Sequence, residues 1–173
     1  FRALATRGNL NNHIGVPLTL LSIKPDTEMA VVEMGANHPG EIADLCLLSD
    51  PDFGLITNVG KAHLEGFGSF EGVIETKTAL YRHIKANGQA VFVNRMNDIL
   101  WQRSEGQNRI SYGCHNSADY PVEQGPCAPY LSVKWQEQEI KTRLVGAYNF
   151  ENVAAAIAVG SYFGVDQKAI VEA

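Results

Sequence analysis

Three side chains in this sequence have types and positions suited to chemistry at a phosphate or a metal ion. Glu33 stands near the end of an apolar run, His63 lies in a loop after another such run, and Lys77 lies near the apolar stripe of a helical segment. A carboxylate and an imidazole suit Mg²⁺ or Mn²⁺, with phosphate oxygens completing the coordination shell. A lysine on a half-buried face can hold phosphate or be chemically modified. The plainer interpretation is a loop histidine that binds nothing and a lysine whose ammonium reaches solvent.

The stretch 55–69 is predicted to position His63. Residues 53–59 have the apolar, β-branched composition of a buried strand, which breaks at Gly60 into a glycine-containing loop. Ser69 is predicted to cap the helix that follows, over residues 69–84. The histidine therefore lies at the carboxyl end of a strand, which is where open α/β sheets bind their ligands.

Glu33 occupies the corresponding place in the preceding unit. Residues 29–34 form a continuous apolar run, typical of a strand covered on both faces of a parallel sheet. A carboxylate in such a run is costly unless it is paired or binds a cation. The loop 35–41 follows, and Pro39 and Glu41 suit the start of a helix. In the earlier loop, Asn9, Asn11 and Asn12 are the kind of residues that form turns.

The order of elements predicts a three-layer α/β fold. Strands are expected at residues 1–5, 29–34, 53–59, 89–94 and 109–112, with helices from about Pro17, from Glu41, at 69–84 and at 98–103. This alternation favours a parallel sheet with crossover helices. Gly88 is expected at the C-terminal end of the 69–84 helix.

A different pattern begins at Cys114. Residues 114–145 are predicted to form a small antiparallel subsheet, because 130–136 and 139–145 alternate apolar and polar side chains around a Gln-Glu-Gln turn. A small-residue helix follows over 153–159, with Asn149 as a candidate cap. Gly164 is expected to end it, and Asp166 to cap the last helix.

Composition limits the classes of protein. The 173 residues suffice for one sizeable domain, expected to span the whole chain, and the net charge of −5 gives no indication of a nucleic-acid partner. No apolar run approaches the roughly 20 residues that span a membrane. The three cysteines form no CxxC pair, which favours a reduced, cytoplasmic setting. Both ends fall inside expected elements, so we expect a domain cut from a longer protein.

Four strings together resemble the Mur ligase family, in the right order along nearly the whole chain. They are Gly-Asn-Leu-Asn-Asn-His-Ile-Gly-Val-Pro-Leu-Thr-Leu-Leu (8–21), Val-Glu-Met-Gly-Ala-Asn-His-Pro-Gly-Glu-Ile (32–42), Ile-Thr-Asn-Val-Gly-Lys-Ala-His-Leu-Glu-Gly-Phe-Gly-Ser (56–69) and Gly-Ala-Tyr-Asn-Phe-Glu-Asn-Val-Ala-Ala-Ala (146–156). The first two favour the members that add D-alanyl-D-alanine to UDP-N-acetylmuramoyl-tripeptide. The resemblance implies the central, ATP-binding domain, with a fold like that of P-loop NTPases.

The resemblance also implies a reaction. In this family ATP phosphorylates the carboxylate of the nucleotide-linked peptide, and the amine of the second substrate attacks the acyl phosphate. ADP and phosphate leave, and Mg²⁺ offsets the charge as phosphates and carboxylate come together. The implied cofactors are ATP and Mg²⁺, and the implied role is bacterial peptidoglycan precursor synthesis in the cytoplasm.

Site residues follow from the motifs. Glu33 matches the acid that binds the Mg²⁺ shared with ATP, His63 matches a ligand of a second Mg²⁺, and Lys77 matches a lysine that these ligases often carry as a carbamate. Family asparagines near the nucleotide are matched by Asn12 (or its neighbour Asn11), Asn149 and Asn152. The resemblance further implies that Asn58 and the loop of Asn37 and His38 line the active site.

The sequence departs from the family pattern in what it lacks. No Gly-x-x-Gly-Lys-Thr phosphate loop occurs in residues 1–173, and it is expected to lie before residue 1. The family's N-terminal and C-terminal domains are absent too, so the chain alone is expected to be inactive and to bind ATP weakly. The alternatives are another Mur ligase, a folylpolyglutamate synthase-like amide ligase, a metal-dependent hydrolase using Glu33 and His63, and a degenerate scaffold domain.

Overall fold

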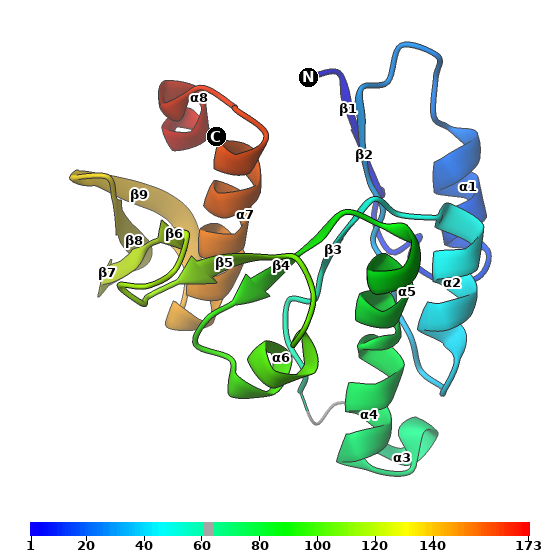
Figure 1. Ribbon diagram of the computed structural model, residues 1–173. Coiled ribbons are helices and arrows are strands. Elements are labelled where there is room, and N and C mark those ends of the chain that lie inside the picture. Colours follow the sequence, from blue (N-terminus) through cyan, green and yellow to red (C-terminus); the bar gives the residue numbers. More distant parts are fainter. Residues whose placement is uncertain (61–63) are drawn as a thin grey trace. The chain divides into compact units, whose positions relative to one another are not determined.

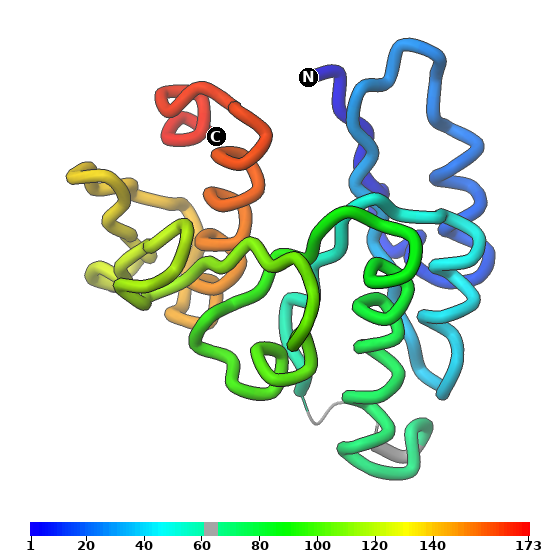
Figure 2. Tube along the Cα trace, in the orientation of Figure 1, coloured from blue at the N-terminus to red at the C-terminus, as the bar shows by residue number. Residues whose placement is uncertain are grey.

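The computed structural model describes residues 1–60 and 64–173 and consists of two compact units (Figure 1). The first unit comprises residues 1–54 and 59–89, and the second comprises residues 55–58 and 90–173. Figure 2 follows the same path from the N-terminus to the C-terminus. Each unit is described by itself below.

The first unit is built on two parallel strands and a layer of helices. Strand β1 (Ala3–Ala5) pairs with β2 (Met29–Val31), with Leu4 opposite Ala30. Helix α1 (Gly15–Leu21) packs against α2 (Glu41–Ser49), which packs against α5 (Ala79–Asn87), and Figure 1 shows α1 and α2 side by side. Their contact forms a core around Ile42, Cys46 and Ala79. The expected strands and crossover helices of this half are therefore confirmed.

The apolar run 29–34 is less covered than its composition predicts. The strand β2 ends at Val31, whose exposed fraction is 55%, and Ala30 is exposed as well. On β1, Ala3 and Ala5 are also exposed. The expectation of cover on both faces is not met in this chain, because Ala30 and Val31 point to opposite faces of the sheet and both are exposed.

The helix expected over 69–84 is divided in two. Helix α4 (Phe70–Lys77) and α5 meet at Thr78, which ends the first and precedes the second. The cap at Ser69 is confirmed, since its hydroxyl accepts a hydrogen bond from Gly72 N at 3.0 Å. Gly88 follows α5 as expected. A short helix, α3 (Leu64–Phe67), lies within the segment predicted as a loop.

The second unit contains a sheet in the order β3–β4–β5–β6. Its strands are β3 (Phe53–Leu55), of which Leu55 belongs to this unit, β4 (Ala90–Asn94), β5 (Arg109–Gly113) and β6 (Tyr120–Pro121). Pairing is parallel between β4 and β5 and between β5 and β6. All residues of β4 are buried, and helix α7 (Phe150–Tyr162) packs against β4 and β5. Helices α6 (Asp98–Arg103) and α8 (Gln167–Glu172) complete the unit, the latter capped by Asp166.

The predicted hairpin is confirmed and extended by one strand. Strands β8 (Tyr130–Trp135) and β9 (Gln138–Val145) pair antiparallel around Gln136 and Glu137, which both have positive φ, at 48° and 63°. Positive φ at both central residues is the signature of a two-residue turn that matches the twist of the strands. Strand β7 (Glu123–Cys127) joins β8 from the proline-containing segment, which sequence reasoning left without a strand.

Across residues 1–60 and 64–173, the structure contains no helix with the length and apolar character needed to cross a lipid bilayer.

Candidate functional site

The carboxylate of Glu33 is held at the end of β2 by contacts from two earlier segments. Its backbone N–H donates to Thr6 Oγ1 at 2.9 Å, and Thr6 N in turn donates to Val31 O at 3.0 Å. Its Oε1 accepts a hydrogen bond from Asn11 Nδ2 at 2.8 Å. Because these bonds fix both the backbone and one carboxylate oxygen, the side chain is presented in a defined direction although it is exposed.

Two neighbouring asparagines have different roles in the loop before α1. The side-chain Oδ1 of Asn12 accepts from Ile14 N at 3.0 Å and from Gly15 N at 2.9 Å, and its carbonyl accepts from Val16 N. Asn12 therefore does the work of a helix cap. Asn11 contacts Glu33 instead, so of the two asparagines that the motif left open, the structure brings only Asn11 into contact with the predicted metal ligand.

The loop after Glu33 is organised by a carboxylate that sequence reasoning treated only as a helix start. Glu41 Oε2 accepts from Asn37 N at 2.6 Å and from His38 N at 2.9 Å, and its Oε1 lies 3.6 Å from His38 Nδ1. The two backbone hydrogen bonds, more than the nearby imidazole, lower the pKa of Glu41. The detectable signal was an acid four residues after Asn37 and three after His38, the spacing at which a side chain at a helix start reaches back to preceding N–H groups.

Loop 35–41 also approaches α3 closely. A β-carbon on Gly66 would lie 2.1 Å from the carbonyl oxygen of Asn37, a distance no side chain tolerates. The glycine is therefore required by the close approach of two backbone segments. Both segments come from the predicted active-site motifs, so this contact joins the loop of Asn37 and His38 to the segment that follows residue 63.

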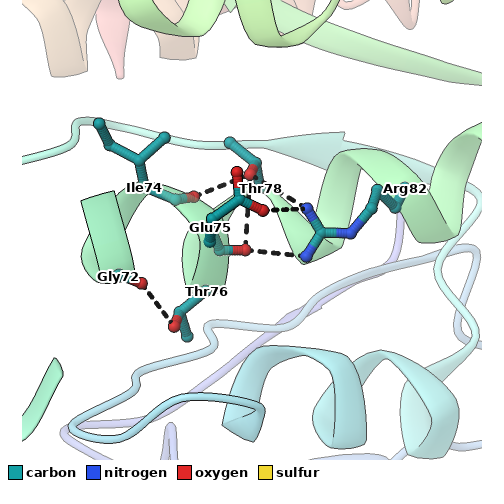
Figure 3. Close-up of polar contacts among 6 residues, drawn as sticks. All are labelled: Gly72, Ile74, Glu75, Thr76, Thr78 and Arg82. Carbon is teal, nitrogen blue, oxygen red and sulfur yellow. Dashed lines mark hydrogen bonds and ion pairs between the residues drawn. The ribbon is translucent and has the colours of Figure 1, made fainter.

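Lys77 is the last residue of α4, and neighbouring side chains stabilise the junction between α4 and α5 that follows it. Thr78 Oγ1 donates to Ile74 O at 2.8 Å, and Arg82 donates to Glu75 through Nη1 to Oε2 at 3.1 Å and through Nη2 to the carbonyl at 2.9 Å (Figure 3). Lys77 is half-buried, and burial lowers its pKa from the usual 10.5. A lowered pKa increases the fraction of neutral, nucleophilic amine.

Two further residues, His63 and Asn58, were predicted for the site. His63 lies outside the described residues. Asn58 is exposed and follows β3. Among the residues that the structure describes, no group of three or more histidine, cysteine, aspartate or glutamate side chains is arranged to hold a metal ion.

In the second unit, the two asparagines predicted to lie near a nucleotide sit at the start of α7. Asn149 occupies the cap position, but its side chain does not cap the helix; its Nδ2 donates to Val145 O at 3.0 Å. The prediction that Asn149 caps this helix with its side chain is therefore wrong, because the side-chain amide bonds the preceding strand instead. Asn152 Nδ2 lies 3.5 Å from Asn149 Oδ1. The structure brings this pair together with both side chains at the N-terminal end of α7.

The same helix end lies beside a buried phenol. Tyr112 on β5 is fully buried, and burial together with the negative charge of Glu151 raises its pKa. Its hydroxyl has no hydrogen-bond partner in the part of the chain that the structure describes.

The donor set around Glu33 fits a hard divalent cation. One carboxylate oxygen bonds Asn11, and no other side chain among the described residues bonds the carboxylate. Mg²⁺ binds through one or two carboxylates, keeping several waters and taking phosphate oxygens from its substrate. A single oriented glutamate is consistent with such a site.

Comparison with known proteins agrees with the fold and the motifs. The family model for the Mur ligase middle domain matches residues 1–160. Curated relatives named UDP-N-acetylmuramoyl-tripeptide–D-alanyl-D-alanine ligase are similar: the protein of Bacillus subtilis is 36% identical over 168 residues, covering 95% of this chain and 36% of that one. The Escherichia coli protein is 37% identical over 175 residues, covering 96% and 39%.

Solved structures give the same result. A crystal structure of MurF from Acinetobacter baumannii superposes with a TM-score of 0.83 at 30% identity, covering 98% of this chain and 39% of that one. MurF ligase from Thermotoga maritima, solved in complex with ADP, gives 0.77 at 28% identity, covering 95% and 40%. The chain spans between 36% and 40% of the length of these relatives. Since the family model matches residues 1–160, the chain belongs to the Mur ligase family, as its middle domain.

Proposed function

We propose that this chain is the central, ATP-binding domain of a ligase that adds D-alanyl-D-alanine to UDP-N-acetylmuramoyl-tripeptide. The observation that carries the proposal is the Glu33 carboxylate at the end of β2, with one oxygen bonded by Asn11. This carboxylate stands within a string similar to that family, and relatives that cover most of this chain carry the name of that ligase. We propose further that both units belong to one domain, with the family's other domains on either side in a cytoplasmic protein.

The proposed chemistry answers a specific difficulty, because a carboxylate is a poor electrophile. Phosphorylation by ATP converts the peptide carboxylate to an acyl phosphate, whose carbonyl carbon the amine of the dipeptide attacks. Phosphate departs with the C–O electron pair, and the amide bond remains. Mg²⁺, when bound, offsets the negative charge that gathers as ATP and the carboxylate approach each other.

The residues of this chain have separate roles in that reaction. Glu33 is proposed to hold the cation shared with the ATP phosphates, and His63 to ligate a second. Lys77 is proposed to carry a carbamate, which converts a cationic side chain into a carboxylate-like ligand. The burial that lowers the pKa of Lys77 supports this role, because only the neutral amine reacts with CO₂.

The nucleotide is proposed to contact four asparagines. Asn149 and Asn152 lie together at the start of α7, where amide groups can donate to and accept from a nucleobase. Asn12 and Asn58 are proposed from their places in the strings 8–21 and 56–69. Because Asn12 uses its Oδ1 to cap α1, its amide nitrogen is the atom proposed to face the nucleotide.

The chain by itself is proposed to be inactive and to bind ATP weakly. A phosphate loop supplies the backbone N–H groups that cradle the phosphates, and residues 1–173 contain no such sequence. Calorimetric titration of residues 1–173 with Mg²⁺-ATP tests this, and tight binding would overturn it.

Phosphate release by the longer protein that carries this chain tests the activity. We expect release with Mg²⁺-ATP and UDP-N-acetylmuramoyl-tripeptide to require D-alanyl-D-alanine, and to be lost in His63→Ala and Glu33→Gln. Release that does not depend on the dipeptide would indicate another amine substrate. Absence of release from a folded, full-length protein would reject the ligase.

A further inference from the structure

The hydrogen bond between Asn11 and Glu33 suggests a role for Asn11 other than helix capping. Asn11 Nδ2 donates to Glu33 Oε1 at 2.8 Å, across 22 positions in the sequence. An amide donor occupies one lone pair of one carboxylate oxygen, which restricts rotation of the carboxylate and leaves the second oxygen for another partner. Groups that orient a metal ligand in this way tune the affinity of the site without touching the ion.

Asn11 is itself held rigidly. Its carbonyl accepts from Gly35 N at 2.7 Å, and its own N–H donates to Asn9 O at 2.8 Å. The side-chain amide lies against Gly35, where a β-carbon would come within 3.0 Å of Asn11 Cγ and Nδ2. The absence of a side chain at residue 35 therefore leaves the room that the amide needs to reach Glu33.

We propose that Asn11 is a positioning residue that orients the Glu33 carboxylate toward a divalent cation, with Gly35 as the residue that makes room for it. This inference rests on the proposed function, since it assumes that Glu33 binds the cation. Asn11 and Asn12 therefore have different roles. Among the contacts of the described residues, the side chain of Asn12 bonds only the start of α1. Asn11 does not contact the cation itself.

The test measures cation binding directly, apart from turnover. Mn²⁺ is titrated into the full-length protein with ADP, and bound ion is counted by electron paramagnetic resonance. We expect Asn11→Ala to weaken Mn²⁺ binding about 10-fold, as is typical for loss of an orienting partner. Asn9→Ala is the matched control, because Asn9 is exposed in the same loop and contributes only its backbone carbonyl to Asn11.

The double variant separates an indirect role from a direct one. If Asn11 acts through Glu33, the combination of Asn11→Ala and Glu33→Gln binds Mn²⁺ no more weakly than Glu33→Gln alone. An additional loss in the double variant would overturn the positioning role, and so would an unchanged affinity in Asn11→Ala. If Asn11→Ala does not fold, Gly35→Ala displaces the same amide and is expected to weaken binding in the same direction; normal affinity there would overturn the proposal.

The two proposals fail in different ways. Unchanged Mn²⁺ binding in Glu33→Gln would reject the metal role of Glu33 and with it the role of Asn11. Loss of binding in Glu33→Gln with normal binding in Asn11→Ala would reject only the positioning role.

Discussion

At the scale of single residues, Glu41 is expected to stabilise the loop that the active-site motif contains. Its carboxylate accepts from Asn37 N and His38 N, so Glu41→Ala leaves two backbone donors without their partner. We expect a loss of about 1 kcal/mol in the free energy of unfolding at pH 7, measured by urea denaturation of the full-length protein. Asp44→Ala is the matched control, because Asp44 is an exposed acid in the same first turn of α2.

The pH dependence of that effect has a definite sign. Hydrogen bonding lowers the pKa of Glu41 in the folded state below its ordinary value of 4.5. A depressed carboxyl pKa contributes stability that is present above 4.5 and is lost as the pH falls through the folded-state value. The difference between wild type and Glu41→Ala should therefore shrink at acid pH; a constant difference would show that the charge is not responsible.

Lys77 gives a second prediction at this scale. Formation of a carbamate joins the amine nitrogen to the carbon of CO₂ and releases a proton, so it requires the neutral amine. Because burial lowers the pKa of Lys77 below 10.5, the neutral fraction rises at a lower pH than it does at an ordinary lysine. With ¹³C-labelled bicarbonate, we expect a carbamate resonance that grows with pH, disappears in Lys77→Arg and persists in Lys85→Arg. A resonance that survives Lys77→Arg would place the modification elsewhere.

At the scale of elements, the junction of α4 and α5 is braced by one guanidinium. Arg82 reaches both the carboxylate and the carbonyl of Glu75, so the bond spans the break at Thr78 beside Lys77 (Figure 3). Both side chains are partly exposed, so we expect Arg82→Ala to lower the free energy of unfolding by about 0.5 kcal/mol, and less at high salt. Lys85→Ala on the same helix is the control. An equal loss in both variants would mean that the removal of a positive charge from α5, and not the brace, is responsible.

Strong local patterns were sufficient to predict most elements. The cap at Ser69, the buried strand β4 and the turn at Gln136 and Glu137 all follow from neighbouring residues. The break at Thr78 has no such signal, because the apolar spacing continues through it and the backbone N–H of Thr78 still donates to Ile74 O. The side-chain bonds of Thr78 and Arg82 accompany the break and are not visible in the local pattern. Asn149 was misassigned for a related reason: the carbonyl of Val145, four residues earlier in β9, competes for its amide, and the path of the chain decides the competition.

At the scale of the whole molecule, the motifs predict which residues belong to the candidate site but not the contacts among them. Glu33 and Lys77 were predicted from type and position, whereas the bond from Asn11 to Glu33 joins two loops separated by 22 positions. Such a contact depends on how β1 and β2 are aligned, and no local spacing encodes it. The close approach of Gly66 to Asn37 is invisible in the sequence for the same reason.

The exposed residues of β1 and β2 lead to a prediction about the longer protein. A two-stranded sheet is marginal by itself, and parallel sheets are ordinarily covered on both faces. Val31 is 55% exposed here, and the small side chains of Ala3 and Ala5 leave room for close packing. Since the chain spans 36% to 39% of the length of its curated relatives, we expect segments outside residues 1–173 to cover this surface.

Hydrogen–deuterium exchange measures that cover directly. Peptides from residues 1–33 should exchange more slowly in the full-length protein than in residues 1–173 alone, because amide exchange follows local opening, and added packing raises the free energy of that opening. Peptides from β8 and β9 serve as the internal control, since they already pair with each other within this chain. Equal exchange of residues 1–33 in the two proteins would mean that β1 and β2 keep an open face in the complete molecule, and that the apolar run 29–34 has a different explanation.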